Sequence, residues 1–356
     1  MIKLLHAADF HLDSAFSALS SEQAAQRRKE QRMALQDFAK LCQGCDIVLL
    51  SGDLFDSARI YRDTLDTLKA CFASIEAQIF IAPGNHDCVL SGCPYLTEDW
   101  GENVHIFLKP EIECVHLEHL GCDVYGAAFV SSEQPPLLRG FRVADESAVN
   151  LMVLHADTQQ NSPYNYISPA DIAESGLDYL ALGHVHSLSV ERVGSTTYAY
   201  PGCLMGRGFD ECGQKGVLRV EAEKNRCTSE FLPLLTRRYE ILTVEVGDDA
   251  LSSIRAALPE THENDCYRII LTGESDGVDL HALEDALCDA FFSLTLRDQT
   301  LPKQELWACV GEDTLRGHFL RELKAKYDAA EQEDKAIFAR AAKLGLALMD
   351  GREVTL

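Results

Sequence analysis

Short apolar runs alternate with longer amphipathic stretches along the first part of the chain. Residues 2–7 have the pattern of a buried strand. Ser20 and Gln23 have the spacing of a capping box, which predicts a helix that runs to Leu41 and stops at Gly44. The same rhythm continues with a strand, a helix and a strand, expected over 46–50, 62–75 and 78–82. This alternation indicates βαβ units and a layered α/β sandwich.

Beyond residue 100 the apolar runs follow one another with shorter connections. We expect strands over 104–107, 112–116, 124–128, 151–154, 179–182, 196–200, 216–220 and 228–232. The last three are expected to be antiparallel. A mixed central sheet therefore fits the pattern better than a purely parallel one.

A new pattern of apolar and polar residues begins near Thr236. Residues 239–298 are predicted to form strand, helix, strand, helix and strand, which is a compact βαβαβ module. Two helices follow, expected over 313–330 and 333–348, with apolar residues near helical spacing. We therefore predict three parts, over residues 1–236, 237–310 and 311–356.

The length and composition agree with this division. The chain has 356 residues, of which 46% are hydrophobic, enough for about two globular domains. No apolar run approaches the ~20 residues of a membrane span, and the N-terminus lacks the apolar core of a signal peptide. We expect a soluble, cytoplasmic protein.

Thirteen cysteines do not indicate a disulfide framework, because their number is odd and no export signal precedes them. Cys42 and Cys45 form a C-x-x-C pair, but no second pair follows at zinc-finger spacing. We expect the cysteines to be small buried apolar residues, with a structural zinc site as the less favoured alternative.

The net charge of −24 argues against extensive binding along a nucleic-acid backbone, which usually requires a basic surface. Residues 1–236 carry a net charge of −14 and the remaining residues carry −10, so neither part is a basic domain.

Five short segments place a carboxylate, an imidazole or an amide directly after a predicted strand. They are Asp9-Phe-His11, Gly52-Asp53-Leu-Phe-Asp56, Gly84-Asn85-His86-Asp87, His155 and Gly183-His184-Val-His186. Each segment alone is typical of a turn, a cap or a satisfied core histidine. Ligands gather at the carboxyl ends of strands in layered α/β folds, so the five together predict one site.

The residue types at this site predict metal chemistry. Asp, His and Asn without a thiolate suit Mn²⁺, Fe²⁺ or Zn²⁺. Seven such ligands are too many for one ion and suit two that share a bridging carboxylate. Two ions roughly 3.5–4 Å apart would activate a bridging water and neutralise charge during in-line displacement at phosphorus. Their added positive charge would also attract a phosphodiester locally to an acidic chain.

The order of the segments resembles the calcineurin-like metallophosphoesterase superfamily. The opening His6-Ala-Ala-Asp-Phe-His-Leu-Asp13 and the later Tyr200-Pro-Gly202, Gly206-Arg-Gly-Phe-Asp210 and Lys215-Gly216 are similar to SbcD-type DNA repair exonucleases, and among these to the bacterial YhaO-like branch. The motifs cover residues 1–220. The resemblance implies a four-layer α/β sandwich with mixed central sheets and a small α+β capping domain, which the C-terminal module matches by placement only.

The resemblance also implies a role for each residue. The implied ligands are Asp9, His11 and His186 for the first metal, Asn85, His155 and His184 for the second, and Asp53 as the bridge. His86 would face the scissile phosphate, stabilising the transition state or protonating the leaving oxygen. Asp56 and Asp87 would orient the loops or the imidazoles. His6 is expected to be a buried structural histidine.

Two groups of basic residues leave alternatives open. Arg207 would either contact a substrate phosphate or pair with Asp210 or Glu211. Arg27-Arg28-Lys29, with Arg32, is the densest basic patch of the chain. We expect it to be a solvated helix face, with contact to DNA or a partner as the alternative.

The function that the resemblance implies is a two-metal-dependent phosphodiesterase acting on DNA in repair, with Mn²⁺ favoured over Fe²⁺, Zn²⁺ or Mg²⁺. The implied partners are DNA and an SMC-like (SbcC-type) ATPase, which the C-terminal helices would engage unless they pack only on their own module. SbcD-type nucleases are commonly dimers, so the resemblance is compatible with a homodimer, which no residue of this sequence indicates by itself. No membrane is expected to be involved. The alternatives are a metallophosphodiesterase of a small nucleotide or phosphodiester, and a mainly architectural partner of the ATPase.

Overall fold

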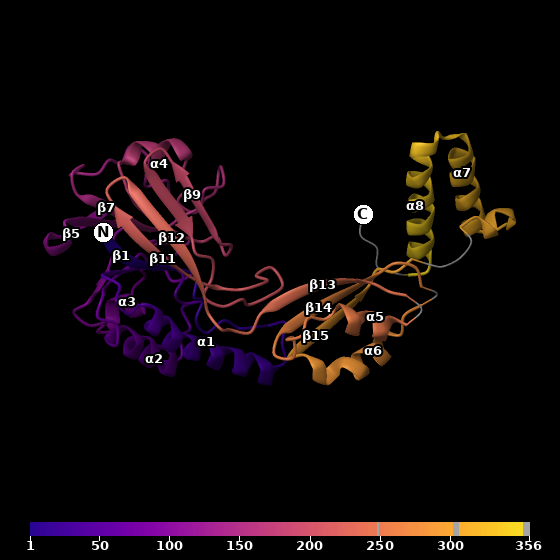
Figure 1. The fold of residues 1–356 in the computed structure, drawn as a ribbon, viewed down its shortest axis with the longest axis horizontal. Helices are drawn as coiled ribbons and strands as arrows, with labels where there is room; N and C mark the ends of the chain where they lie inside the picture. Colours follow the sequence, from indigo (N-terminus) through magenta and orange to yellow (C-terminus); the bar gives the residue numbers. More distant parts are fainter. Residues whose placement is uncertain (248, 276, 302–305, 352–356) are drawn as a thin grey trace. The chain divides into compact units, whose positions relative to one another are not determined.

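The computed structural model describes residues 1–247, 249–275, 277–301 and 306–351. The chain forms two compact units, Met1–Arg238 and Tyr239–Leu356 (Figure 1). The assignment of the parts as a nuclease domain, a capping domain and partner-binding helices stays a prediction, and the end of the third part, 352–356, lies outside the described residues.

The first unit contains two six-stranded sheets. The first sheet has the strand order β12-β11-β1-β2-β3-β4. Its strands are β1 (Ile2–Ala7), β2 (Ile47–Leu50), β3 (Gln78–Ile81), β4 (Val104–Ile106), β11 (Gly216–Glu223) and β12 (Arg226–Pro233). Strands β1 to β4 are parallel. At the β1 side, β11 is antiparallel to β1, and the edge strand β12 is antiparallel to β11. The loops that follow β1, β2 and β3 therefore meet at one edge.

The second sheet has the strand order β5-β6-β7-β8-β10-β9. Its strands are β5 (Glu113–Leu117), β6 (Cys122–Gly126), β7 (Val149–His155), β8 (Tyr179–Gly183), β9 (Ser189–Val193) and β10 (Thr196–Tyr200). The four central strands are parallel, and the two edge strands β5 and β9 are antiparallel to their neighbours. Both sheets are thus mixed.

Helices cover the outer faces of both sheets. The helical elements of this unit are α1 (Ser21–Leu41), α2 (Arg62–Ala73), α3 (Pro94–Thr97), α4 (Pro169–Ser175) and the 3₁₀ turn η1 (Glu118–Leu120). Helices α1 and α2 pack on the first sheet and α4 packs on the second (Figure 1). The predicted α/β sandwich with mixed sheets is confirmed.

Alternation along the strands builds the three apolar layers between these elements. Val48 lies between the first sheet and its helices, and its neighbour Leu49 lies between the two sheets. In the second sheet, Val153 faces the first sheet and Leu154 faces the layer that contains α4. Because central strands are covered on both faces, their sequences are continuous apolar runs.

The start of helix α1 confirms the predicted capping box. The Ser20 hydroxyl accepts from the backbone N–H of Gln23 at 3.2 Å, and the Gln23 side chain accepts from the backbone N–H of Ser20 at 3.2 Å. The helix ends at Leu41, and Gly44 follows with a φ of +75°. This left-handed conformation favours glycine and turns the chain toward β2.

The interpretation of the basic patch as a solvated helix face is wrong for Arg27, which is fully buried. Its guanidinium donates to Glu30 Oε2 at 2.7 Å and to the backbone oxygen of Gly206 at 2.7 Å. Arg27 lies on the same helical face as the buried Ala24 and Ala34, so its position on the helix places it inside. The charge is retained there because it is paired.

The structure differs from the strand predictions at one end of the second sheet. Strand β9 and helix α4 were not predicted, and β10 is not purely antiparallel. Strand β10 lies between β8, to which it is parallel, and β9, to which it is antiparallel. After β8 the chain runs to the edge of the sheet and forms β9, then turns back and forms β10 between β9 and β8. This path makes β10 antiparallel to β9 and parallel to β8.

The second unit contains a three-stranded parallel sheet with the order β13-β14-β15. Its elements are β13 (Tyr239–Glu245), α5 (Ala250–Ala257), β14 (Cys266–Thr272), α6 (Leu280–Leu287), the 3₁₀ turn η2 (Cys288–Ala290) and β15 (Ser293–Asp298). Ile254 of α5 and Leu283 of α6 pack with Ile269 of β14 in one apolar cluster. The predicted βαβαβ module is confirmed.

The chain then forms η3 (Ala308–Gly311), α7 (Leu315–Ala329) and α8 (Gln332–Met349), as an antiparallel helical hairpin (Figure 1). Leu320 of α7 packs with Ala342 and Leu346 of α8. A Cβ at Gly345 would lie 2.1 Å from the Phe319 ring, so glycine is what permits the close approach. Leu315, Ile337 and Leu348 remain exposed.

All thirteen cysteines are described and all are free thiols, five of them buried, six partly exposed and two exposed. Cys42 and Cys45 are not disulfide-bonded, and burial raises the pKa of the Cys42 thiol. Within the described ranges, none of the helices has the length and apolar character to cross a membrane.

Candidate metal centre

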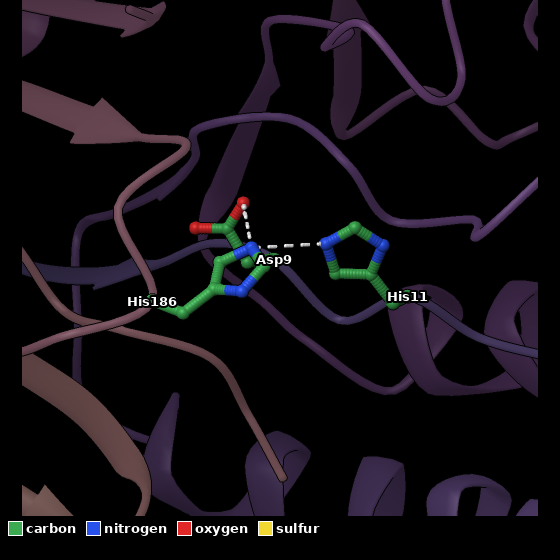
Figure 2. A group of neighbouring side chains, drawn as sticks. All are labelled: Asp9, His11 and His186. Carbon is green, nitrogen blue, oxygen red and sulfur yellow. Dashed lines mark hydrogen bonds and ion pairs between the residues drawn. The ribbon is translucent and has the colours of Figure 1, made fainter. Parts of the chain in front are cut away.

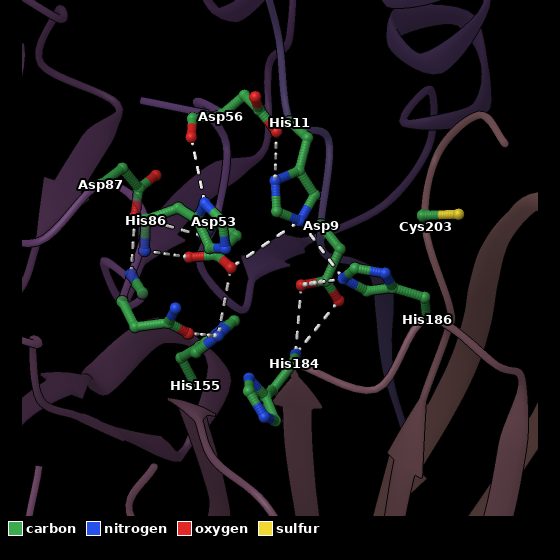
Figure 3. A network of polar contacts seen from close by, with 12 residues as sticks. Asp9, His11, Asp53, Asp56, His86, Asp87, His155, His184, His186 and Cys203 are labelled. Atoms are coloured by element: carbon green, nitrogen blue, oxygen red, sulfur yellow. Dashed lines mark hydrogen bonds and ion pairs between the residues drawn. The ribbon is translucent and has the colours of Figure 1, made fainter. Parts of the chain in front are cut away.

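The five predicted segments meet at the carboxyl ends of strands from both sheets. Asp9 follows β1, Asp53 follows β2, and Asn85 and His86 follow β3 in the first sheet. His155 ends β7, and His184 and His186 follow β8 in the second sheet. Figure 3 shows the labelled side chains converging in the space between these loops. The sequence-predicted residues are therefore neighbours in space.

The loops leave their strands through left-handed backbone. Asp9, His11, Asp53 and His184 have φ values of 52°, 42°, 52° and 103°. Non-glycine residues adopt this conformation at a cost of about 1–3 kcal/mol, which the surrounding structure must offset. Two backbone hydrogen bonds join the first two loops, from Asp9 N to Gly52 O at 3.0 Å and from His11 N to Asp53 O at 2.9 Å.

Two glycines of the motifs have steric roles in this structure. A Cβ at Gly84 would lie 2.2 Å from Asp53 Oδ1, and one at Gly183 would lie 1.9 Å from the backbone oxygen of Ser51. Both contacts are closer than any side chain tolerates, so a larger residue would push the Asp53 and β2 loops away from the centre.

The first group of ligand atoms comes from Asp9, His11 and His186 (Figure 2). The Nε2 atoms of His11 and His186 are 3.2 Å apart, and His186 Nε2 is 3.6 Å from Asp9 Oδ1. Asp9 and His11 are fully buried. The pKa of Asp9 is lowered, because the bond to His186 and the nearby imidazoles outweigh the opposing effect of burial.

The second group surrounds Asp53 and His155. Asp53 Oδ2 lies 3.4 Å from His155 Nε2 and 3.7 Å from His11 Nε2, which places this carboxylate between the two histidines. Asn85 Oδ1 lies 2.9 Å from His155 Nε2. Asp9, Asp53 and His155 also form a group whose ligand atoms lie within 4.8 Å of one another.

The hydrogen bonds around these histidines fit a bound cation. His155 Nδ1 donates to the backbone oxygen of Ser51 at 2.9 Å, so in the neutral imidazole Nε2 presents a lone pair to Asn85 Oδ1 and Asp53. The paired Nε2 atoms of His11 and His186 likewise point at each other. Lone pairs and carboxylates that converge in this way repel unless a cation lies among them, so the donor set suits a divalent metal.

His86 is exposed beside the second group. Its backbone N–H donates to Asp53 Oδ1 at 2.9 Å and its Nδ1 donates to the backbone oxygen of Asp56 at 3.0 Å. His86 also forms a group of three with His11 and Asp53, within 4.8 Å. Its assignment to the scissile phosphate in place of a metal stays a prediction.

The His184 imidazole lies beside His155, with the two ring centroids 5.2 Å apart. Its backbone N–H donates to both carboxylate oxygens of Asp9 at 3.1 Å, whereas its Nε2 lies 3.7 Å from Asp157 Oδ2 and its ring lies against Tyr164. Among the described residues, the three groups of ligand atoms do not include His184. Its place as a ligand of the second metal stays a prediction, and Asp157 and Tyr164 are neighbours that sequence reasoning did not single out.

Asp87 holds the Asp53 loop in place. Its carboxylate accepts backbone N–H groups from Gly84 at 2.7 Å, Leu54 at 2.7 Å and Asp53 at 3.3 Å, and the hydroxyl of Tyr95 at 2.6 Å. A carboxylate with this many donors fixes the loop that carries the shared Asp53 ligand. The orienting role that the resemblance implies for Asp87 stays a prediction, and these contacts suit it.

Asp56 and Arg207 lie side by side. Asp56 Oδ1 is 3.2 Å from His11 Nδ1 and accepts Arg207 Nη1 at 2.9 Å. Burial raises the pKa of Asp56, but the bond to His11 and the Arg207 charge outweigh it, lowering the pKa to about 2.

Glu211 is the residue of this site that sequence reasoning considered only as a surface partner of Arg207. It is 2% exposed, and its Oε1 lies 2.7 Å from His186 Nδ1 and 2.6 Å from Arg207 Nη2. Bonds from His186 and Arg207 outweigh burial and lower the pKa of Glu211. Its position four residues after Arg207 was the only signal in the sequence.

Burial lowers the pKa of His186, but bonds to Asp9 and Glu211 raise it to about 9.

His6 is buried below the centre, as expected. Its Nδ1 lies 2.9 Å from the Tyr179 hydroxyl and its Nε2 lies 3.0 Å from the Ser51 hydroxyl. Burial lowers the pKa of His6 to about 3. The ring is therefore a neutral link between the two sheets.

A fold of two mixed sheets with these ligand groups at their carboxyl edges defines a metallophosphoesterase. The profile of the calcineurin-like phosphoesterases matches residues 2–188, and the chain belongs to this family. A similar curated protein is the uncharacterised metallophosphoesterase YhaO of Bacillus subtilis (strain 168), 26% identical over 337 residues that span 86% of this chain and 80% of YhaO.

Solved structures show weaker likeness. An archaeal phosphodiesterase is 15% identical, with a TM-score of 0.35, over 65% of this chain and 100% of its own. Vps29 of Entamoeba histolytica in complex with Zn²⁺ is 14% identical, with a TM-score of 0.31, over 65% of this chain and 99% of its own. Likeness at this level says nothing about substrate.

Proposed function

We propose that this metallophosphoesterase is a two-metal-dependent phosphodiesterase that acts on DNA, as an exo/endonuclease of the SbcD type in DNA repair. The overlap of the ligand groups supports a centre of two metal ions, because Asp9, His11 and Asp53 each belong to two of the three groups. Overlap of this kind supports two ions that share ligands, rather than one ion with a closed set of four.

The ligands of the first ion would be Asp9, His11 and His186. Those of the second would include Asn85 and His155, with Asp53 shared. Bound ions would supply an activated water and neutralise charge on the phosphoryl oxygens. Oxygen and imidazole donors without thiolate support Mn²⁺, with Fe²⁺, Zn²⁺ and Mg²⁺ as alternatives.

The chain itself would provide the proton transfer. Because His86 Nδ1 donates to the backbone oxygen of Asp56, Nε2 is the atom left to exchange a proton with the substrate. The bond from the His86 backbone to Asp53 keeps this imidazole beside the shared carboxylate. With both ring nitrogens protonated, His86 would serve as general acid, giving the Nε2 proton to the leaving oxygen and becoming the neutral imidazole.

The similarity to SbcD-type nucleases in residues 200–216, and a second α/β unit after the phosphoesterase unit, support DNA as the substrate. The net charge of −24 supports weak binding of DNA by the chain alone, so a partner protein would supply the further contacts to DNA. We propose an SMC-like ATPase as that partner, docking on the α7–α8 hairpin where Leu315, Ile337 and Leu348 are exposed. A homodimer is proposed on the same resemblance.

The test is hydrolysis by the full chain with Mn²⁺. Labelled duplex DNA, labelled single-stranded DNA and bis(p-nitrophenyl) phosphate are assayed in parallel, with and without the ATPase. We expect cleavage of DNA that EDTA abolishes and that falls steeply with added salt, since phosphate contacts release counterions. Turnover without metal would refute the metallophosphodiesterase.

The small-substrate alternative predicts a different result in the same assay. Hydrolysis of bis(p-nitrophenyl) phosphate with no cleavage of either DNA, at any salt concentration and with the ATPase present, would favour a small nucleotide or phosphodiester. The architectural alternative predicts that His86→Ala retains the biological phenotype while losing all turnover.

A further inference from the structure

We propose that Arg207 is a positioning residue that holds two histidine ligands of the first metal through two carboxylates. His11 and His186 come from loops of different sheets, yet their Nε2 atoms approach to 3.2 Å. A pair of imidazoles can meet in this way only if something fixes each ring from behind. The inference rests on the proposed function only in requiring a metal at this group.

Each imidazole is supported at its far nitrogen by a carboxylate. His11 Nδ1 lies 3.2 Å from Asp56 Oδ1, and His186 Nδ1 lies 2.7 Å from Glu211 Oε1. A carboxylate this close to Nδ1 favours the tautomer that has its proton there and leaves the Nε2 lone pair for a metal. Arg207 Nη2 also lies 3.2 Å from His186 Nδ1, so the guanidinium contacts this ring directly as well. The two supports are equivalent in chemistry but come from loops far apart in the sequence, since Asp56 and Glu211 are separated by 155 positions.

One guanidinium joins the two supports. Arg207 Nη1 donates to Asp56 Oδ1 at 2.9 Å, and Nη2 and Nε donate to Glu211 Oε1 at 2.6 and 3.1 Å. The backbone N–H of Arg207 adds a bond to Glu211 Oε2 at 2.8 Å. The planar fork of arginine reaches two carboxylates at once, which the single ammonium of lysine does not reproduce.

The charges explain why this cation is needed. Glu211 is 2% exposed, and the Asp56 side chain is 27% exposed. Without Arg207 these two anions would face the buried Asp9 carboxylate with only the histidines between them. A buried charge that loses its partner costs far more than a surface one, so the loops would separate.

The same bonds weigh against Arg207 as a contact to a substrate phosphate. Three of its five N–H donors are directed at Asp56 and Glu211, and its side chain is only 20% exposed. A phosphate would have to compete with two carboxylates that already compensate the charge. The position of Arg207 therefore favours holding the ligands over holding the substrate.

The experiment measures Mn²⁺ binding to the full chain by calorimetry, beside steady-state kinetics on bis(p-nitrophenyl) phosphate. Arg207→Ala is expected to weaken one of two Mn²⁺ equivalents by about 10–100-fold and leave the other unchanged. The kcat falls at low Mn²⁺ and recovers at saturating Mn²⁺, while KM for the substrate stays within twofold. Arg207→Lys is expected to recover only part of the lost affinity.

Arg142→Ala is the matched control, because Arg142 pairs with Glu174 on the exposed surface. It should change neither Mn²⁺ affinity nor kinetics. If Arg207→Ala does not fold, as judged by circular dichroism, Glu211→Gln replaces it, since the amide keeps the shape and removes the charge. The double variant Arg207→Ala with Glu211→Gln should lose less affinity than the sum of the single variants, because both act through His186.

The outcomes separate this inference from the proposed function. Unchanged Mn²⁺ affinity with a raised KM in Arg207→Ala would overturn the inference and make Arg207 a substrate contact. Unchanged affinity and unchanged KM would overturn it as well. A wild-type chain that binds no divalent ion would refute the proposed function itself, and the inference with it.

Discussion

Backbone conformation at single residues sets the direction in which the metal-site loops leave their strands. Asp9, His11 and Asp53 all have positive φ. Asp and Asn tolerate this region better than most side chains, so aspartate ligands at Asp9 and Asp53 limit the strain. An Asp→Asn exchange at either position therefore removes the charge and leaves the backbone as it is.

Asp53→Asn and His86→Ala should separate metal binding from proton transfer. Because Asp53 belongs to two ligand groups, its loss is expected to weaken binding of both ions by on the order of 100-fold. His86→Ala is expected to retain the metal and to lower turnover by about 10²–10⁴-fold. Metal content by plasma mass spectrometry and rates on bis(p-nitrophenyl) phosphate measure the two effects. Loss of one ion from His86→Ala would instead assign His86 as a ligand.

Asp87→Asn should destabilise the first unit. The amide cannot accept all the donors that the carboxylate satisfies, so a backbone N–H of the Asp53 loop is left unpaired. The expected loss is about 2 kcal/mol in the free energy of unfolding, measured in urea. Asp99→Asn, at an exposed carboxylate with one bond to Gly101, is the control and should change stability by less than about 0.5 kcal/mol. Equal losses in both variants would contradict the role of Asp87.

The site was predictable where chemical type coincided with the end of a strand. Asp9, Asp53 and His155 could be assigned to one centre because each follows an apolar run. Glu211 and Asp157 could not, because a carboxylate in a loop has no periodic pattern that marks it. Their contacts arise from tertiary packing, which brings distant loops to the same imidazoles.

At the scale of elements, helix α1 is tied to the end of its unit by a buried charge network. Glu30 accepts from Arg27 Nη1 at 2.7 Å and from Arg237 Nη2 at 2.8 Å. Burial raises the pKa of Glu30, but the Arg237 bond and the charge of Arg27 outweigh it and lower the pKa below its ordinary 4.5. A lowered pKa in the folded state stabilises the fold above pH 4.5 and loses this contribution as the pH falls below it.

Glu30→Gln should therefore be destabilising at pH 7, by about 2 kcal/mol. The difference from wild type should shrink as the pH falls below 4.5, because Glu30 of the unfolded wild-type chain then takes up a proton, which favours unfolding. Urea unfolding at pH 7 and pH 3.5 measures this. Glu22→Gln, at an exposed position on the same helix, serves as control. A difference that is constant with pH would contradict the charge network.

Element predictions succeeded where local pattern and tertiary structure agreed. The bounds of β1 and β10 match the predicted ranges 2–7 and 196–200, and the Ser20 capping box fixed the start of α1. The β9 edge strand was missed because most of its residues are exposed and polar, so no apolar run marks it. The parallel pairing of β10 with β8 depends on the return from this edge, which no local pattern encodes.

At the scale of the whole molecule, the two units have separate apolar cores. The first has three layers around two sheets, and the second has a cluster around β14 and another in the α7–α8 hairpin. The metal ligands all belong to the first unit. Damage to the core of the second unit should therefore leave the metal centre intact.

Ile269→Ala tests this separation. Ile269 is fully buried in β14, so the cavity should destabilise the second unit by about 2–5 kcal/mol. Mn²⁺ affinity should stay at the wild-type value, while a separate unfolding transition moves to lower urea. Ile241→Ala, at an exposed position of the neighbouring strand, should shift neither. A loss of Mn²⁺ affinity in Ile269→Ala would show that the units are coupled.

The candidate ligands come from both sheets of the sandwich, with Asp9 and Asp53 on one side and His155 and His186 on the other. An ion held by both sides is a crosslink, so the sheets cannot part without releasing it. At a free Mn²⁺ concentration 100 times its Kd, the linkage is worth about 2.7 kcal/mol. Hydrogen exchange measures it: chelation should speed exchange at the amides of β2 and β7 together and leave β14 unaffected.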